Sequence, residues 1–99
     1  MVLRITLQEG TRPRATLRLE GSVSGAWTAL LERECTGLLR AWGALCLDLA
    51  GVAFVDRAGI DVLGRLSRAG VEIRGCSATV ASVLEGEGVR LAAETEEPA

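Results

Sequence analysis

The chain of 99 residues contains no histidine, no lysine and no tyrosine. The lack of histidine removes the side chain most often used as a general base and as a metal ligand. The lack of lysine excludes a phosphate-binding loop of the G-x-x-x-x-G-K-[ST] type, and no G-x-S-x-G nucleophile pattern is present. These absences predict a protein that is not an enzyme.

Cysteine is also scarce, and its three positions, Cys35, Cys46 and Cys76, include no C-x-x-C pair. An odd count without paired spacing excludes a disulfide framework and argues against a zinc site. We therefore expect each cysteine to be a small packing residue in a reducing compartment. No metal or other cofactor is predicted.

Charge of one sign does not dominate, since the formal net charge is -2 and the eleven basic residues, all arginine, are scattered along the chain. Nucleic-acid binding needs a concentrated basic surface, so nucleic acid is not an expected partner. The longest apolar stretch, residues 44–55, is interrupted by Asp48 and is too short to span a bilayer. The N-terminus has no long apolar core of a signal peptide. We expect a cytoplasmic protein without direct membrane insertion.

Several segments have the residue patterns of β-strands. Two show period-two alternation of apolar and polar residues, which predicts an antiparallel hairpin joined by a turn at residues 10–14. Another is a nearly continuous apolar run that ends at Gly51, as is typical of a central strand covered on both faces. We expect strands at residues 3–7, 15–19, 44–49 and 71–74, and a further edge strand at residues 89–91.

Three other segments have the periodicity of helices, with apolar residues recurring every three or four positions. The first should begin after Ser22 or Ser24, either of which can cap it, and should end at Gly43. The second should follow Asp56, and the third should follow Ser77. The expected buried stripes are Trp27, Leu31, Cys35, Leu38 and Trp42 in the first helix, Ile60, Leu63 and Leu66 in the second, and Val80, Val83 and Leu84 in the third.

Strands that alternate with helices imply crossover connections and a mixed sheet. The sequence therefore predicts an α/β domain with a mixed β-sheet of about four to five strands and about three helices packed mainly on one face. We assign residues 1–92 to this single domain and residues 93–99 to an acidic C-terminal tail.

The segment around Asp56 combines a buried strand, a loop and the start of a helix. A carboxylate at that position can accept hydrogen bonds from the first-turn N–H groups of the helix. The small residues Ala58 and Gly59 follow, and they leave the backbone open to close approach. Two interpretations are open: an ordinary capped helix with tight internal packing, which is the simpler one, or a helix start that receives a partner.

The run LDLAGVAFVDRAGIDVLGRL resembles the signature of the STAS family, which includes bacterial anti-sigma factor antagonists. That signature is a strand ending in Asp, an apolar strand and loop, and then Asp-Ser-Ser/Ala-Gly-Leu/Ile at the start of a helix. The matching residues are Asp48, Phe54, Asp56, Gly59 and Ile60, and the order of elements matches over roughly residues 2–88. The resemblance implies a STAS-like sheet of this kind and a role in binding other proteins.

In STAS domains, the loop and helix start after the central strand form the partner-binding surface. The resemblance therefore implies that the partner is a protein, either an anti-sigma factor or kinase-like regulator or a subunit of a larger complex. The residues it assigns to this surface are Asp56, Arg57, Ala58, Gly59 and Asp61, with Ser22 and Ser24 on the adjoining loop.

The sequence departs from the family at the residue that is usually a phosphorylated serine, which is Ala58 here. Arg57 replaces another residue that is commonly serine, and no Ser, Thr or Tyr occurs from Ala50 to Arg65. The predicted loop therefore has no hydroxyl to phosphorylate. A phosphate would bring about -1.5 to -2 charges, and that switch is absent.

A second departure is the short C-terminus, because family members commonly continue with another strand and a helix. One flank of the sheet is then left for a partner, for a second copy in a homodimer, or for the tail. Two functions remain open: a regulator like the anti-sigma factor antagonists, or a structural subunit of an assembly such as a lipid-handling ABC transporter or a stress-signalling scaffold. A ligand sensor is less favoured, because the sequence has no phosphate-binding loop.

Overall fold

The computed structural model describes residues 2–8 and 14–92. Most of the predicted turn at residues 10–14 lies outside this part of the chain, and so does the whole acidic tail at residues 93–99. The elements in chain order are β1 (Leu3–Gln8), β2 (Arg14–Val23), α1 (Trp27–Trp42), β3 (Ala44–Val55), α2 (Arg57–Arg68), β4 (Glu72–Arg74) and α3 (Ala78–Gly86).

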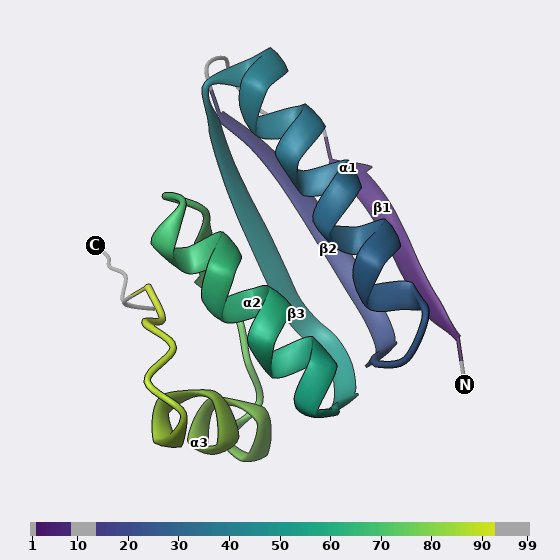
Figure 1. Ribbon diagram of the computed structural model, residues 1–99, viewed down its shortest axis with the longest axis vertical. Coiled ribbons are helices and arrows are strands. Elements are labelled where there is room, and N and C mark those ends of the chain that lie inside the picture. The colour runs from purple at the N-terminus through teal and green to yellow at the C-terminus, as the bar shows by residue number, and fades with distance from the viewer. Residues whose placement is uncertain (1, 9–13, 93–99) are drawn as a thin grey trace.

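The four strands form one mixed sheet in the order β1-β2-β3-β4. β1 runs antiparallel to β2, as the hairpin prediction requires, whereas β3 runs parallel to both of its neighbours, β2 and β4. Helices α1 and α2 lie side by side over the same face of this sheet, and α3 lies beside the start of α2 (Figure 1). The predicted mixed α/β architecture is confirmed.

The core lies between that sheet face and the helices. Alternate residues of the two central strands are at most 2% exposed, which is the period-two pattern of a strand with one face buried. They are Ala15, Leu17 and Leu19 in β2 and Leu45, Leu47 and Leu49 in β3. Leu31 and Cys35 of α1 and Leu63 and Leu66 of α2 pack against them. β2 and β3 therefore form the centre of this core.

The cysteines are free thiols, and two of them are buried, as a packing role requires. Burial raises the pKa of the Cys35 thiol to about 12. Burial also raises the pKa of Cys46, whose sulfur accepts a hydrogen bond from Arg74 Nε at 3.1 Å. Both thiols therefore stay protonated and unreactive near neutral pH.

Both central strands run further than the sequence predicted. β2 continues through Gly21 to Val23, and β3 does not stop at Gly51 but continues to Val55. The register steps from Arg18↔Asp48 to Glu20↔Gly51, so β3 accommodates one extra residue there. A β-bulge lets a strand stay paired although its alternation of side chains is interrupted. The predicted strand break at Gly51 was therefore wrong.

Two predicted core side chains are exposed instead. Trp27 at the start of α1 is 37% exposed, and Val83 of α3 is 42% exposed. The buried lines of these helices run through the adjacent residues, Thr28 in α1 and Leu84 in α3. Adjacent residues point about 100° apart around a helix axis, so Trp27 and Val83 are turned away from the core.

The expected edge strand at residues 89–91 does not form. Val89 is buried, but the backbone of this segment makes a single ladder-like hydrogen bond, from Ala92 N to Ile73 O at 2.8 Å. The segment covers the outer edge of β4 without becoming a strand. No helix in residues 2–8 and 14–92 is both long enough and apolar enough to cross a membrane.

Candidate protein-binding site

Two loops meet at one end of the sheet, because parallel neighbouring strands end side by side. Val23 at the end of β2 pairs with Val55 at the end of β3, and Asp56 N donates to Val23 O at 3.2 Å. The β2–α1 loop and the β3–α2 loop are therefore neighbours, although about thirty residues separate them in sequence. The sequence-predicted site lies in and around these two loops.

The Asp56 carboxylate joins the two loops. Its Oδ1 atom accepts a hydrogen bond from Gly59 N at 2.8 Å and caps α2, as predicted. Its Oδ2 atom accepts from Gly25 N in the other loop at 3.0 Å. These backbone donors, first Gly59 and then Gly25, hold the pKa of Asp56 below its ordinary value. Both carboxylate oxygens are thus occupied within the domain.

Gly59 has a packing role as well. A Cβ atom at this position would collide with the backbone oxygen of Val23 and would lie 2.8 Å from Val55 Cγ1. The start of α2 therefore rests directly on the ends of β2 and β3. The close approach that the small residue permits is to the protein's own backbone, which agrees with the simpler of the two sequence interpretations.

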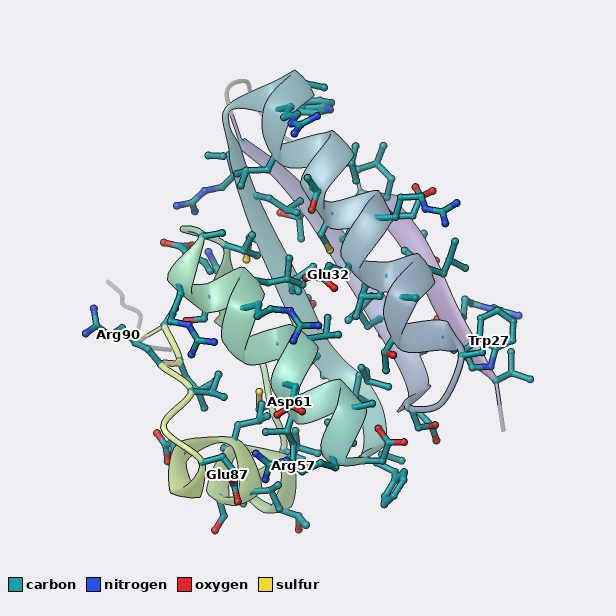
Figure 2. The ribbon with its side chains drawn as sticks, in the orientation of Figure 1. Trp27, Glu32, Arg57, Asp61, Glu87 and Arg90 are labelled. Carbon is teal, nitrogen blue, oxygen red and sulfur yellow. The ribbon has the colours of Figure 1, made fainter. Side chains whose placement is uncertain are left out.

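Arg57 and Asp61 form the exposed charged part of the site. Arg57 Nη1 lies 2.8 Å from Glu87 Oε1, and Arg57 Nη2 lies 3.2 Å from Asp61 Oδ1. Figure 2 shows these three labelled side chains close together, where the start of α2 meets the segment after α3. The positive charge of Arg57 is therefore paired with two carboxylates rather than standing alone.

Ala58 is exposed at the second position of α2, between Arg57 and the buried Gly59. Its methyl group is the side chain that this structure presents where the resemblance expects a serine. The exposed part of the helix start is therefore a small apolar group beside a paired arginine.

The two serines of the adjoining loop are not placed as predicted. Ser22 is 1% exposed within β2, so its side chain is not available to a partner. Ser24 is half-buried, and neither serine caps α1, which has no side-chain cap. The Thr28 hydroxyl instead donates to Gly25 O at 2.8 Å. β2 continues to Val23, so α1 begins only at Trp27, later than the serines predicted.

The structure adds contacts and exposed side chains at this end of the molecule that the sequence did not assign. Gly25 supplies a donor to Asp56 from a left-handed conformation at φ 59°, and Glu87 pairs with Arg57. Phe54, two residues before Asp56, is 48% exposed, and Trp27 is partly exposed. Phe54 matched the signature but was not assigned to the surface, and the tertiary structure shows that it is exposed.

Within the described ranges, no group of three or more potential ligand side chains could hold a metal ion. The carboxylate best placed for chemistry, Asp56, spends both oxygens on backbone donors. The exposed groups around it are the apolar Ala58 and Phe54 and the paired charges of Arg57 and Asp61.

The backbone is similar to three solved structures of this size. One is an anti-sigma factor antagonist from Mycobacterium paratuberculosis, with a TM-score of 0.67 and 17% identity over 87% of this chain and 80% of that one. Another is the anti-sigma factor antagonist SpoIIAA in its unphosphorylated form, with a TM-score of 0.64 and 20% identity over 83% and 82% of the two chains. The third is Bacillus SpoIIAA in its phosphorylated form, with a TM-score of 0.68 and 17% identity over 92% and 93%.

The chain has a STAS-like fold. A scan against family models and a search of curated proteins give no match. The likeness therefore lies in the arrangement of the backbone. Within this STAS-like fold, Asp56 and Gly59 join the helix start to the sheet, and Arg57, Ala58 and Asp61 lie on its surface.

We expect Asp56→Ala to lower the melting temperature at pH 7 by a few degrees, because it leaves Gly25 N and Gly59 N without their acceptor. The folded-state pKa of Asp56 is lowered, so its stabilising effect is present above the unfolded pKa of about 3.9 and is lost as pH falls through the folded value. The melting temperatures of both proteins, measured from pH 7 to pH 2, should therefore approach each other as the pH falls below about 4.

Asp61→Ala is the matched control, because Asp61 pairs with Arg57 on the exposed surface and caps no helix. It should change the melting temperature much less than Asp56→Ala at every pH. Equal effects of the two substitutions at pH 7 would show that the Asp56 contacts do not stabilise the domain.

We expect Gly59→Ala to destabilise the domain by about 1–3 kcal/mol or more, since the added methyl meets backbone that cannot move without separating α2 from β2. Gly37→Ala in α1 adds the same methyl where no atom lies within 4 Å, and it should stabilise by up to about 1 kcal/mol. Urea unfolding of both variants measures the difference, and a neutral Gly59→Ala would contradict the proposed packing.

Proposed function

We propose that this protein is a non-catalytic, cytoplasmic protein-binding regulator comparable to the anti-sigma factor antagonists. The start of α2 binds its partner, and this surface is not switched by phosphorylation. The proposal rests on one observation, which is that Ala58 is exposed at the start of α2 in a STAS-like fold. Asp56 and Gly59 hold this helix start against the sheet.

The proposed contact surface combines rigid backbone with accessible side chains. Asp56 fixes both loops, so the exposed groups Phe54, Arg57 and Ala58 are presented without a large entropy cost on binding. Phe54 supplies apolar area that a partner can bury, and aromatic side chains are common anchors of protein interfaces. Arg57 and Asp61 provide charge of both signs around this apolar part.

The lack of a hydroxyl makes the state of this surface independent of a kinase acting on it. SpoIIAA is known in an unphosphorylated and a phosphorylated form. In the present chain, residues 50–65 contain no Ser, Thr or Tyr, so the equivalent change of charge has no acceptor there. We infer that the partner is bound whenever both proteins are present, and that abundance controls the complex.

The partner class is tested by affinity purification of the tagged full chain from its native cells, followed by mass spectrometry. Recovery of an anti-sigma factor or a kinase-like regulator supports the proposed function. Recovery of transporter or other complex subunits without such a regulator contradicts it in favour of a structural subunit. The Ala58→Glu protein serves as the control bait, because proteins bound through the α2 start should be missing from its eluate.

With the recovered partner, we expect Ala58→Glu to weaken binding at least about tenfold, since it places a charged side chain in the centre of the contact. Glutamate near a helix N-terminus is favourable for the helix, so the variant should stay folded. Ala41→Glu makes the same change at an exposed position in the last turn of α1 and should bind like the wild type. Isothermal titration calorimetry gives both affinities, and equal values for the two variants would refute the proposed surface.

A further inference from the structure

The two edges of the sheet are covered unequally. β4 has only three residues, and Ala92 N donates to Ile73 O on its outer side. β1 has six residues, Leu3–Gln8, and no described strand pairs with its outer side. The exposed flank is thus the N-terminal one, not the C-terminal one that the short C-terminus suggested.

The backbone of β1 presents a regular set of groups at that edge. Ser22 N donates to Val2 O at 3.3 Å, so the backbone of Val2 points toward β2. Backbone direction alternates along an antiparallel strand, so Arg4 and Thr6 also point toward β2. The N–H and C=O groups of Leu3, Ile5 and Leu7 therefore point outward, where no described strand receives them.

The same three residues form an apolar row on the helix side of the sheet. Leu3 is buried and Ile5 packs against the core, whereas Leu7 is 46% exposed. Helix α1 packs mainly on β2 and β3, and Leu7 at the end of β1 stays half-exposed. Trp27, which Figure 2 shows beside the start of β1, and Leu30 on the same side of α1 are also partly exposed. An unpaired edge thus runs beside an apolar strip.

From this edge we infer that the protein forms a two-fold dimer in which β1 pairs antiparallel with β1 of a second copy. Ile5 then lies opposite Ile5 of the second copy, and Leu3 of each copy lies opposite Leu7 of the other. All outward backbone groups of the three residues then find partners. The two sheets become one continuous sheet with the helices on the same face.

The side chains of β1 fit this self-pairing. Apolar residues stand opposite apolar residues on the helix side, between the two α1 helices. On the other side, Arg4 stands opposite Thr6 of the second copy, so no two like charges face each other directly. Arg4 is the one charged residue in β1, and the strand lacks the proline or multiple charges that protect exposed edges. A second copy supplies the matching strand without a separate partner.

Sedimentation velocity of the full chain over roughly 5–500 μM tests the dimer, since an interface of one strand per subunit is small and should be weak. We expect the mass to rise from the 10.4 kDa of one chain to twice that value. Leu7→Lys should weaken the dimer about tenfold or more while leaving the fold intact, because Leu7 is already half-exposed. A chain that stays monomeric throughout this range overturns the inference.

Gln8→Lys is the matched control, because it adds the same charge one residue along on the opposite face. It should dimerise like the wild type. Equal weakening by both variants would indicate a general charge effect and would overturn the assignment to the Leu3, Ile5 and Leu7 row. Binding of the partner at α2 should be unchanged in Leu7→Lys, so failure of the dimer and failure of the proposed function are distinguishable.

Amide hydrogen exchange of the unmodified protein tests the pairing itself. The N–H groups of Ile5 and Leu7 should become more protected as concentration rises, whereas Thr6 N–H, which points to β2, should be protected at all concentrations. A dimer without this alternating, concentration-dependent protection would use another surface and would refute the inference.

Discussion

The Asp56 carboxylate is the interaction on which the candidate site depends. One oxygen accepts from Gly59 N at the start of α2, and the other accepts from Gly25 N before α1. Since both helices start from these loops, one side chain sets where each begins relative to the sheet. The buried Gly59 completes the arrangement, because only a residue without Cβ lets α2 rest on the Val23 carbonyl.

This arrangement divides the signature segment into two groups of residues with different roles. Asp56 and Gly59 contact the neighbouring backbone and serve the fold, whereas Arg57, Ala58 and Asp61 are exposed to solvent. Substitutions in the first group should change stability, and substitutions in the second change the proposed binding surface. The chain therefore combines a STAS-like fold with an exposed alanine at the second position of α2.

Exposure on this protein follows from how few helices cover the sheet. α1 and α2 cover the strands from β2 to β4, and they leave the β1 edge and the ends of the central strands uncovered. The exposed apolar residues Phe54 and Leu7 lie in these uncovered regions. The proposed partner surface and the proposed dimer edge thus have one origin, a small domain without enough helix to cover its sheet.

The sequence by itself determined the four observed strands, the three helices and the Asp56 cap, because period-two and helical patterns and capping are local properties. It did not determine where β2 and β3 end, and it predicted a strand at residues 89–91 that does not form. It also determined that residues 50–65 carry no hydroxyl. Only the tertiary structure decided that Ser22 is interior, that Trp27 and Phe54 are exposed, and that Arg57 pairs with Glu87. These features depend on where a strand ends relative to the helices above it and on contacts between segments far apart in the chain. No local pattern encodes that information, because the same apolar residue is buried or exposed according to what lies over it.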